Sequence, residues 1–118
     1  MLDERFYRQS PEEARGDRDA ILGEKQWFWF EDILKNNNSK YLVIGLSSTF
    51  HDFIGESWEQ YPGAFERMRR LLGDRKGRLI ISGDVHRNAM YDDSGVMEIV
   101  TSAVARNSVV FGKKRENY

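Results

Sequence analysis

The spacing of apolar residues over Glu24–Lys35 predicts an amphipathic helix with a wide buried face. Gly23 is a candidate N-cap, and the glutamate after it favours the positive end of the helix dipole. The asparagine run that begins at Asn36 predicts the end of the helix. Phe28 and Trp29 widen the apolar stripe, so we expect both rings to lie in the core. The stripe itself consists of Trp27, Phe30, Ile33 and Leu34.

A second helix is predicted to begin near Pro62, because proline is favoured in the first helical turn. Gly73 lies near its predicted end, and Glu66 and Arg70 have the spacing of an i,i+4 ion pair. Its apolar positions again recur at helical spacing: Phe65, Met68, Leu71 and Leu72. Each of the two helices therefore presents one face to a core.

Two short apolar runs, Tyr41–Leu46 and Leu79–Ile81, predict buried strands. Each run leads directly into polar residues, at Ser47–Asp52 and at Ser82–His86. Loops that follow strands often carry functional groups, because the sheet holds them in a fixed position. We therefore expect function at the edge of the sheet where these loops meet.

Two further segments complete the predicted sheet. Asp92–Gly95 has the composition of a hairpin turn, and Val96–Val100 would be the strand that returns from it. Met1–Arg8 alternates imperfectly and predicts a short strand, followed by a polar loop over Gln9–Asp19. The order of elements predicts an α/β (α+β) layer architecture in which helices cover one face of the sheet.

Composition places the 118 residues in one globular domain, with 40% hydrophobic and 13% aromatic residues available for a core. The formal net charge of -1 gives no basic surface for nucleic acid, so we expect no nucleic-acid partner. No apolar stretch approaches the roughly 20 residues that cross a bilayer. Any export signal would lie outside this chain, since its charged N-terminus does not resemble one. The absence of cysteine excludes disulfides and thiolate ligands but leaves the compartment unknown.

Gly83-Asp84-Val85-His86 is the strongest chemical pattern, because it places a carboxylate and an imidazole two residues apart directly after a strand. The glycine lets the backbone turn, so that both side chains can reach one small volume. A hard carboxylate oxygen and an imidazole nitrogen together suit Zn, Fe or Mn. Asp84 and His86 are therefore candidate metal ligands. An ordinary hydrogen-bonded turn is the alternative interpretation.

Four motifs lie in order along nearly the whole chain: Leu2–Arg8, Leu22–Gln26, Trp58 with Tyr61, Pro62 and Arg67, and Gly83–His86. In these motifs the chain resembles the PhoD-like branch of the metallophosphoesterases, often described as alkaline phosphatase D. The corresponding family patterns are D-x-R-x-Y-R, L-G-x-x-Q, W-x-x-Y-P-x-x-R and G-D-x-H. The third departs from the pattern, because Arg67 stands further from Pro62 than the family spacing.

The resemblance implies a sandwich of two mixed β-sheets flanked by helices, with two metal ions at the sheet edge. In such a site the metals bind a small phosphate ester and activate a water that attacks phosphorus. Asp84 and His86 would be ligands with a catalytic role. Because an aspartate replaces the histidine of ordinary metallophosphoesterases, Fe and Ca are favoured, with Zn or Mn as alternatives. Family resemblance also suggests an exported or cell-envelope location.

The ligands for two metals are not all present in residues 1–118. The family's earlier metal-binding segments would lie before Met1, and the chain has only two histidines. A two-metal site needs on the order of six protein ligands. We therefore interpret residues 1–118 as a single partial domain, the C-terminal portion of a PhoD-like metallophosphatase domain. It would be inactive alone, and its expected partner is the missing N-terminal half.

Two other classes of function stay open. A degenerate phosphatase fold could persist as a non-catalytic interaction or scaffold module after losing its metal set. An exonuclease of the wider superfamily is disfavoured by the balanced charge, which provides no basic groove. Coding sequence before Met1 would discriminate, since Asp-rich, G-D and Asn motifs there would support the enzyme.

Four further residues are candidates for the site. His51 follows the first predicted strand and could be a metal ligand or a substrate contact, but a surface histidine on a polar loop is the favoured interpretation. Arg5 has a guanidinium that suits phosphate, and Asp3 could bind a metal or orient an arginine. A structural ion pair is the alternative for both. Asn88 could contact phosphate or only open the hairpin.

Aromatic residues are concentrated just before the second helix, at Phe53, Trp58 and Tyr61. They could line a substrate entrance, but aromatic residues in this position more often anchor packing, and we expect them in the core. Asp92 and Asp93 lack the spacing of a calcium loop and fit a turn instead.

Overall fold

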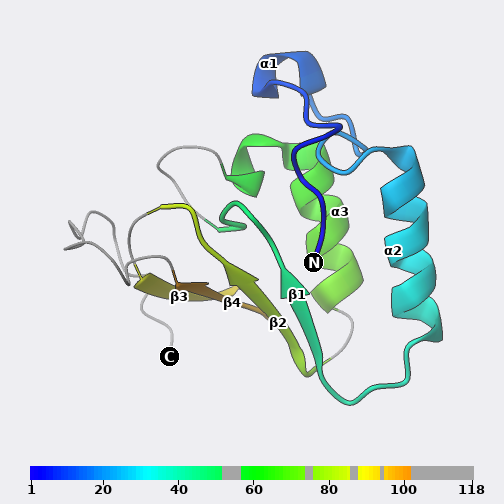
Figure 1. Ribbon diagram of the computed structural model, residues 1–118, viewed down its shortest axis with the longest axis vertical. Coiled ribbons are helices and arrows are strands. Elements are labelled where there is room, and N and C mark those ends of the chain that lie inside the picture. Colours follow the sequence, from blue (N-terminus) through cyan, green and yellow to red (C-terminus); the bar gives the residue numbers. More distant parts are fainter. Residues whose placement is uncertain (52–56, 74–75, 86–87, 94, 102–118) are drawn as a thin grey trace.

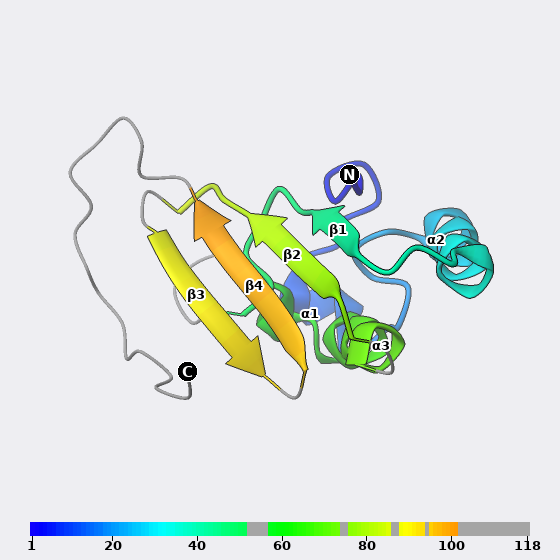
Figure 2. The same cartoon turned by 90° about the horizontal axis from the view of Figure 1, so that it is seen from below.

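The computed structural model describes residues 1–51, 57–73, 76–85, 88–93 and 95–101. In this part of the chain, helix α3 packs against one face of a four-stranded sheet (Figure 1). Helix α2 lies beside α3, beyond the β1 edge of the sheet (Figure 2). The arrangement confirms the predicted α/β class, with helices on one side of the sheet. The described residues do not form the second sheet of the expected sandwich.

The sheet has mixed topology. Its order is β1-β2-β4-β3, in which β1, β2 and β4 are parallel and β3 is antiparallel to β4. Helix α3 therefore forms the crossover between the parallel strands β1 and β2, and β1 lies at an edge. The predicted hairpin is confirmed as the β3–β4 pair, but Asp92 and Asp93, which were expected in its turn, are the last residues of β3. The strand bounds are β1 Leu42–Gly45, β2 Arg78–Ser82, β3 Asn88–Asp93 and β4 Val96–Thr101.

The two apolar runs form strands, but the prediction that they are buried is wrong for one face of the sheet. On the face toward α3, Ile44 and Ile80 are buried. Val43 and Ile81, which point the other way, are exposed. Side chains alternate between the two faces of a strand, and the described helices cover only one of those faces.

Six apolar side chains gather on the uncovered face of the sheet. Val43 lies opposite Leu79 and Leu79 opposite Met97, while Ile81 and Met90 both lie opposite Ile99. Since paired residues share a face, these neighbours form one continuous apolar surface across all four strands. We name this surface the open face of the sheet.

Helix α2, Glu24–Asn36, confirms the first predicted helix. Gly23 is its N-cap with φ 76°, a conformation that glycine adopts without steric cost. The expectation that Phe28 and Trp29 lie in the core is wrong, because they are 75% and 52% exposed. Each residue turns about 100° around a helix, so both lie off the buried stripe. The buried residues of α2 are Trp27, Phe30 and Leu34.

Helix α3, Pro62–Gly73, confirms the second predicted helix. The predicted ion pair is replaced by a neighbouring one: Glu66 contacts Arg69 at 3.2 Å, one turn away at i,i+3. Phe65 and Leu71 pack partly buried against the core. The fully buried residues of the helix are Ala64, Met68 and Leu72.

Arg67 joins α3 to α2 and the preceding loop. Its guanidinium carbon lies 4.4 Å from the centre of the Trp27 ring. Its terminal nitrogens pair with Asp19 Oδ1 at 2.5 Å and with Glu31 Oε1 at 2.8 Å. The arginine of the third motif therefore acts as a bridge within the helical layer.

The predicted strand over Met1–Arg8 is absent, and this prediction is wrong. The backbone of Leu2 bonds to strand β1, with its N–H donating to Gly45 O at 3.0 Å. The backbone then turns, because the Asp3 carboxylate accepts the N–H groups of Arg5 and Phe6. Such local side-chain bonds compete with a strand ladder. Part of the predicted loop is also helical: α1, Pro11–Ala14, begins at a Ser10 capping box.

A cluster of aromatic rings forms the centre of the core. Trp58 begins the short 3-10 helix η1, Trp58–Gln60, and its ring meets Trp27 edge-on with centroids 6.0 Å apart. Phe50 stacks on Phe65 at 4.6 Å. Trp58 and Tyr61 are buried, which confirms their predicted packing role, while Phe53 lies outside the described residues. Among the described helices none has the length and apolar character to cross a membrane.

Candidate functional site

The strands β1 and β2 end side by side, so the two predicted polar loops lie together at the carboxyl end of the sheet. We refer to this end of the strands as the sheet edge. Because the strands are parallel and adjacent, the chain leaves both at the same end (Figure 2). Leu46 continues the pairing beyond β1, donating its N–H to Ile81 O at 2.9 Å. Ser47 and Asp84 therefore follow directly from neighbouring strands, as the sequence predicts.

Asp84 lies at this edge with its side chain 64% exposed. Its φ of 68° is in the left-handed region, which aspartate tolerates better than most residues. A turn directly after β2 thus presents the carboxylate at the surface. His86, the second predicted ligand, lies outside the described residues.

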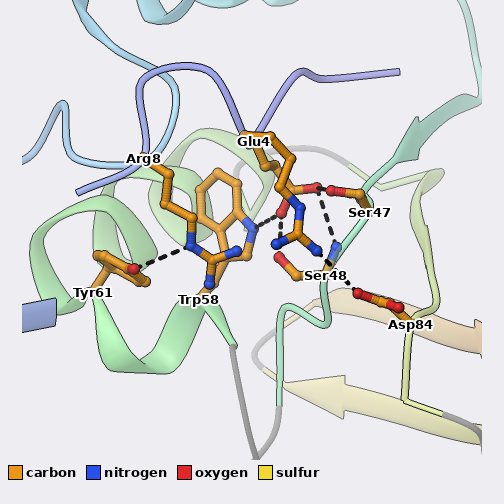
Figure 3. A network of polar contacts seen from close by, with 8 residues as sticks. Glu4, Arg8, Ser47, Ser48, Trp58, Tyr61 and Asp84 are labelled. Carbon is orange, nitrogen blue, oxygen red and sulfur yellow. Dashed lines mark hydrogen bonds and ion pairs between the residues drawn. The ribbon is translucent and has the colours of Figure 1, made fainter. Parts of the chain in front are cut away.

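Arg5 and Asp84 form an ion pair between segments 79 residues apart, with Arg5 Nη2 donating to Asp84 Oδ2 at 2.9 Å (Figure 3). The structure therefore brings together the predicted phosphate-binding arginine and a predicted metal ligand. Because both side chains are exposed, the pair contributes little to stability, typically about 0 to 1 kcal/mol. Its significance is its position at the sheet edge.

Asp3 is turned toward its own backbone. Its Oδ1 accepts Arg5 N–H at 3.0 Å and Phe6 N–H at 3.3 Å. Its backbone is fixed to α2 by Gln26, which accepts Asp3 N–H at 2.8 Å and donates to Asp3 O at 2.7 Å. These contacts shape the segment that carries Arg5. A role for Asp3 as a metal ligand stays a prediction.

Glu4 is a residue of this edge that the sequence did not single out. It is 1% exposed, and its carboxylate accepts hydrogen bonds from Ser47, Ser48 and Trp58 (Figure 3). The available signal was weak: Glu4 stands two residues after buried Leu2, on the inward side of an alternating pattern. Nothing local to Met1–Arg8 indicates the donors, which come from more than 40 positions away.

His51 is not the surface histidine that sequence interpretation favoured over a metal ligand; it is only 2% exposed. Its Nδ1 lies 3.0 Å from Glu98 Oε2, and its backbone N–H donates to the same oxygen at 2.7 Å. Its Nε2 has no hydrogen-bond partner among the described residues and lies 3.7 Å from Asp93 Oδ2. The histidine, which belongs to the loop after β1, thus packs against the β3–β4 hairpin.

Glu98 is the second buried carboxylate that the sequence did not single out. It is fully buried on the helix-facing side of β4 and accepts Phe50 N–H at 2.7 Å, the His51 N–H and the Ser82 hydroxyl. Val96 and Val100, two positions to either side, are also buried. The alternation of β4 therefore did contain the signal that Glu98 points inward.

The remaining candidate, Asn88, is the first residue of β3 and is exposed. It lies opposite Thr101 in the hairpin register. This position agrees with a residue that opens the hairpin, and a phosphate contact stays a prediction.

The described residues do not gather three His, Cys, Asp or Glu side chains that could hold a metal ion. The donor chemistry of Asp84 fits a metal ion, because its exposed carboxylate offers a hard oxygen at a strand end. One such oxygen is only part of a ligand set. A complete metal site at this edge therefore requires donors beyond those described.

Comparisons with known proteins agree with the motifs and the fold. The sequence profile of a family described as PhoD-like phosphatase matches residues 1–117. A solved structure titled "Structure of PhoD" has a similar fold, with a TM-score of 0.72 and 21% sequence identity. That match covers 86% of this chain and 26% of the other, so the chain spans about a quarter of the matched protein. Comparison with curated proteins gives no match.

Proposed function

The chain belongs to the PhoD-like phosphatase family, and from that premise we propose that its sheet edge is part of a metal-dependent site that hydrolyses phosphoric esters. The observation that carries the proposal is the pair formed by Arg5 and Asp84 at the carboxyl end of β2. A carboxylate that can bind a cation and a guanidinium that can bind phosphate lie within one hydrogen bond of each other.

In this proposal Asp84 and His86 bind the metal, with Fe and Ca favoured and Zn or Mn as alternatives. A bound metal supplies charge neutralisation and an activated water for attack on phosphorus. Arg5 would lie beside the metal-bound carboxylate, where the donors of its guanidinium would suit the phosphate oxygens. Asn88 is a further candidate donor to phosphate.

The chain supplies one part of this site. It spans about a quarter of the matched protein, and its described residues contain no complete metal-binding group. We therefore propose that the remaining ligands come from a further part of the domain, the N-terminal half in the family order. The open face of the sheet is where that part would pack, because a bare apolar face is the surface that sheet-on-sheet packing buries. Residues 1–118 alone are then inactive.

The test uses a protein that joins this chain to the N-terminal part of a PhoD-like domain. Asp84→Ala and His86→Ala should each lower the rate of p-nitrophenyl phosphate hydrolysis by about a hundredfold or more, because each removes a metal ligand. Asp32→Ala is the matched control, since Asp32 is an exposed carboxylate on α2. Full activity in the Asp84 variant would overturn the proposal. Failure of the joined protein to bind any metal would favour the non-catalytic module instead.

A further inference from the structure

Five hydrogen-bond donors converge on the carboxylate of Glu4, which Figure 3 shows between Ser47, Ser48 and Trp58. The N–H groups of Ser47 and Ser48 both donate to Oε2, the latter at 3.3 Å, and the Ser47 hydroxyl donates to the same oxygen at 2.9 Å. Oε1 accepts the Ser48 hydroxyl and the indole N–H of Trp58, the latter at 2.6 Å. We name these five donors the Ser47–Trp58 cage.

We propose that the Ser47–Trp58 cage is a binding site for a small carboxylate-type anion, and that Glu4 fills it as an internal ligand. The proposal is independent of the phosphatase activity. It assigns to the loop after β1 a binding chemistry of its own, which remains when the glutamate side chain is removed.

The chemistry of the donors suits an anion. All five are uncharged N–H or O–H groups, and an ionised carboxylate offers about four acceptor sites and no donor. Two consecutive backbone N–H groups that point at one oxygen form the kind of concavity that binds anions in many proteins. With the carboxylate absent, buried donors would be left without an acceptor, which is unfavourable.

The cage is held in place by the core rather than by Glu4. Trp58 is fixed by its edge-on contact with Trp27 and by Phe50 at 5.8 Å, and its backbone N–H donates to Thr49 O at 3.0 Å. The serines follow Leu46, which is bonded to Ile81 O. Ser48 and Trp58 are both buried. The donors should therefore keep their positions when Glu4 is truncated, as a preformed site requires.

Filling the cage also has a consequence for the sheet edge. Glu4 directly precedes Arg5, so an occupied cage holds the segment from which the Arg5 guanidinium reaches Asp84. Glu4 is thus a positioning residue for Arg5. This role requires no contact between the Glu4 carboxylate and a cation or phosphate bound beside Asp84.

The experiment measures whether free formate replaces the missing side chain in the 118-residue chain carrying Glu4→Ala. Thermal unfolding is compared in sodium formate and in sodium chloride at equal ionic strength. We expect formate to raise the midpoint of the variant by about 4 °C or more in a saturable manner, because it binds only the folded state. The wild-type chain and the exposed control Glu12→Ala should show no difference between the two salts.

A spectroscopic signal locates the binding. The chain has three tryptophans, so the 15N-labelled protein gives three indole signals. In Glu4→Ala the Trp58 indole N–H signal should move upfield as its short hydrogen bond is lost, and formate should move it back. Adding Ser48→Ala to this variant should weaken formate binding about tenfold, because one donor to a charged acceptor is removed.

Several outcomes would overturn the proposal. The first is that formate raises the midpoint of Glu4→Ala no more than chloride does, and the second is that it stabilises the wild-type chain equally. If Glu4→Ala is unfolded in chloride, formate must restore both cooperative unfolding and the Trp58 signal, and failure to do so rejects the cage. Tighter binding of inorganic phosphate than of formate would reject the carboxylate class, since the donors are arranged around two oxygens.

Discussion

Two carboxylates at the same edge of the sheet, Glu4 and Asp84, are held in opposite ways. Glu4 is almost completely buried, and five neutral donors occupy both of its oxygens. Asp84 is largely exposed, on a left-handed backbone, and is paired with Arg5. Glu4 is therefore a structural carboxylate, whereas the exposed carboxylate of Asp84 is accessible to a ligand. Whether its oxygens are buried and hydrogen-bonded or exposed therefore distinguishes a structural carboxylate from a candidate ligand.

Glu98 belongs with Glu4 in this comparison. Both are buried, and both accept backbone N–H groups from the loop after β1, Glu4 at residues 47 and 48 and Glu98 at residues 50 and 51. Two inward carboxylates thus accept hydrogen bonds from one loop at two places. We therefore expect that replacing Glu4 or Glu98 lowers the free energy of unfolding, whereas replacing Asp84 lowers metal binding and catalytic activity.

The largest loss of stability is expected for Glu98→Ala. It leaves the N–H groups of Phe50 and His51 and the Ser82 hydroxyl buried without their acceptor. The free energy of unfolding should fall by about 3 kcal/mol or more, measured by urea denaturation. Asp92→Ala, an exposed carboxylate on β3, is the control and should change it by less than about 0.5 kcal/mol. Equal losses of stability in Glu98→Ala and Asp92→Ala would contradict the distinction between buried, hydrogen-bonded carboxylates and exposed ones.

A smaller loss is expected for Trp58→Phe, which removes the indole donor to Glu4 and part of the ring volume. The expected cost is about 2 kcal/mol, whereas Trp29→Phe on the exposed side of α2 should cost less than about 0.5 kcal/mol. In a double-mutant cycle with Glu4→Ala the two losses should not add, since they share one hydrogen bond. If the two losses in the free energy of unfolding add, the hydrogen bond between the Trp58 indole and Glu4 contributes nothing, which would contradict the cage.

The smallest effect on stability is expected for Asp84→Ala and Arg5→Ala. Their ion pair is exposed, so each variant should lower the free energy of unfolding of the 118-residue chain by less than about 1 kcal/mol. Asp84→Ala should cost more than Arg5→Ala, because alanine tolerates the left-handed φ of this position less well than aspartate. The same urea titration measures it. A loss as large as that for Glu98→Ala would make Asp84 a structural residue and weaken its assignment as a ligand.

The features predicted correctly from sequence are those that local chemistry determines. Both long helices follow from apolar spacing within one segment, with Gly23 and Pro62 at their starts. The position of Asp84 follows from a strand that is followed directly by a glycine. The family follows from motifs in the expected order, and its profile covers residues 1–117.

The predictions that failed depended on partners distant in sequence. Phe28 and Trp29 are apolar, but whether a helix face is buried depends on what packs against it, and the described residues leave both exposed. His51 is buried because Glu98 provides an acceptor 47 residues away. Glu4 was missed for the same reason, since a charged residue reads as exposed until its donors are known.

The most direct test of the central claim is the metal content of a protein that joins this chain to the N-terminal part of a PhoD-like domain. Bound metal is measured after dialysis in the parent protein, in Asp84→Ala and in the control Asp32→Ala. The account predicts that Asp84→Ala loses bound metal while the control keeps the full amount. Unchanged metal content in Asp84→Ala would contradict the claim that the exposed carboxylate at the end of β2 is a ligand.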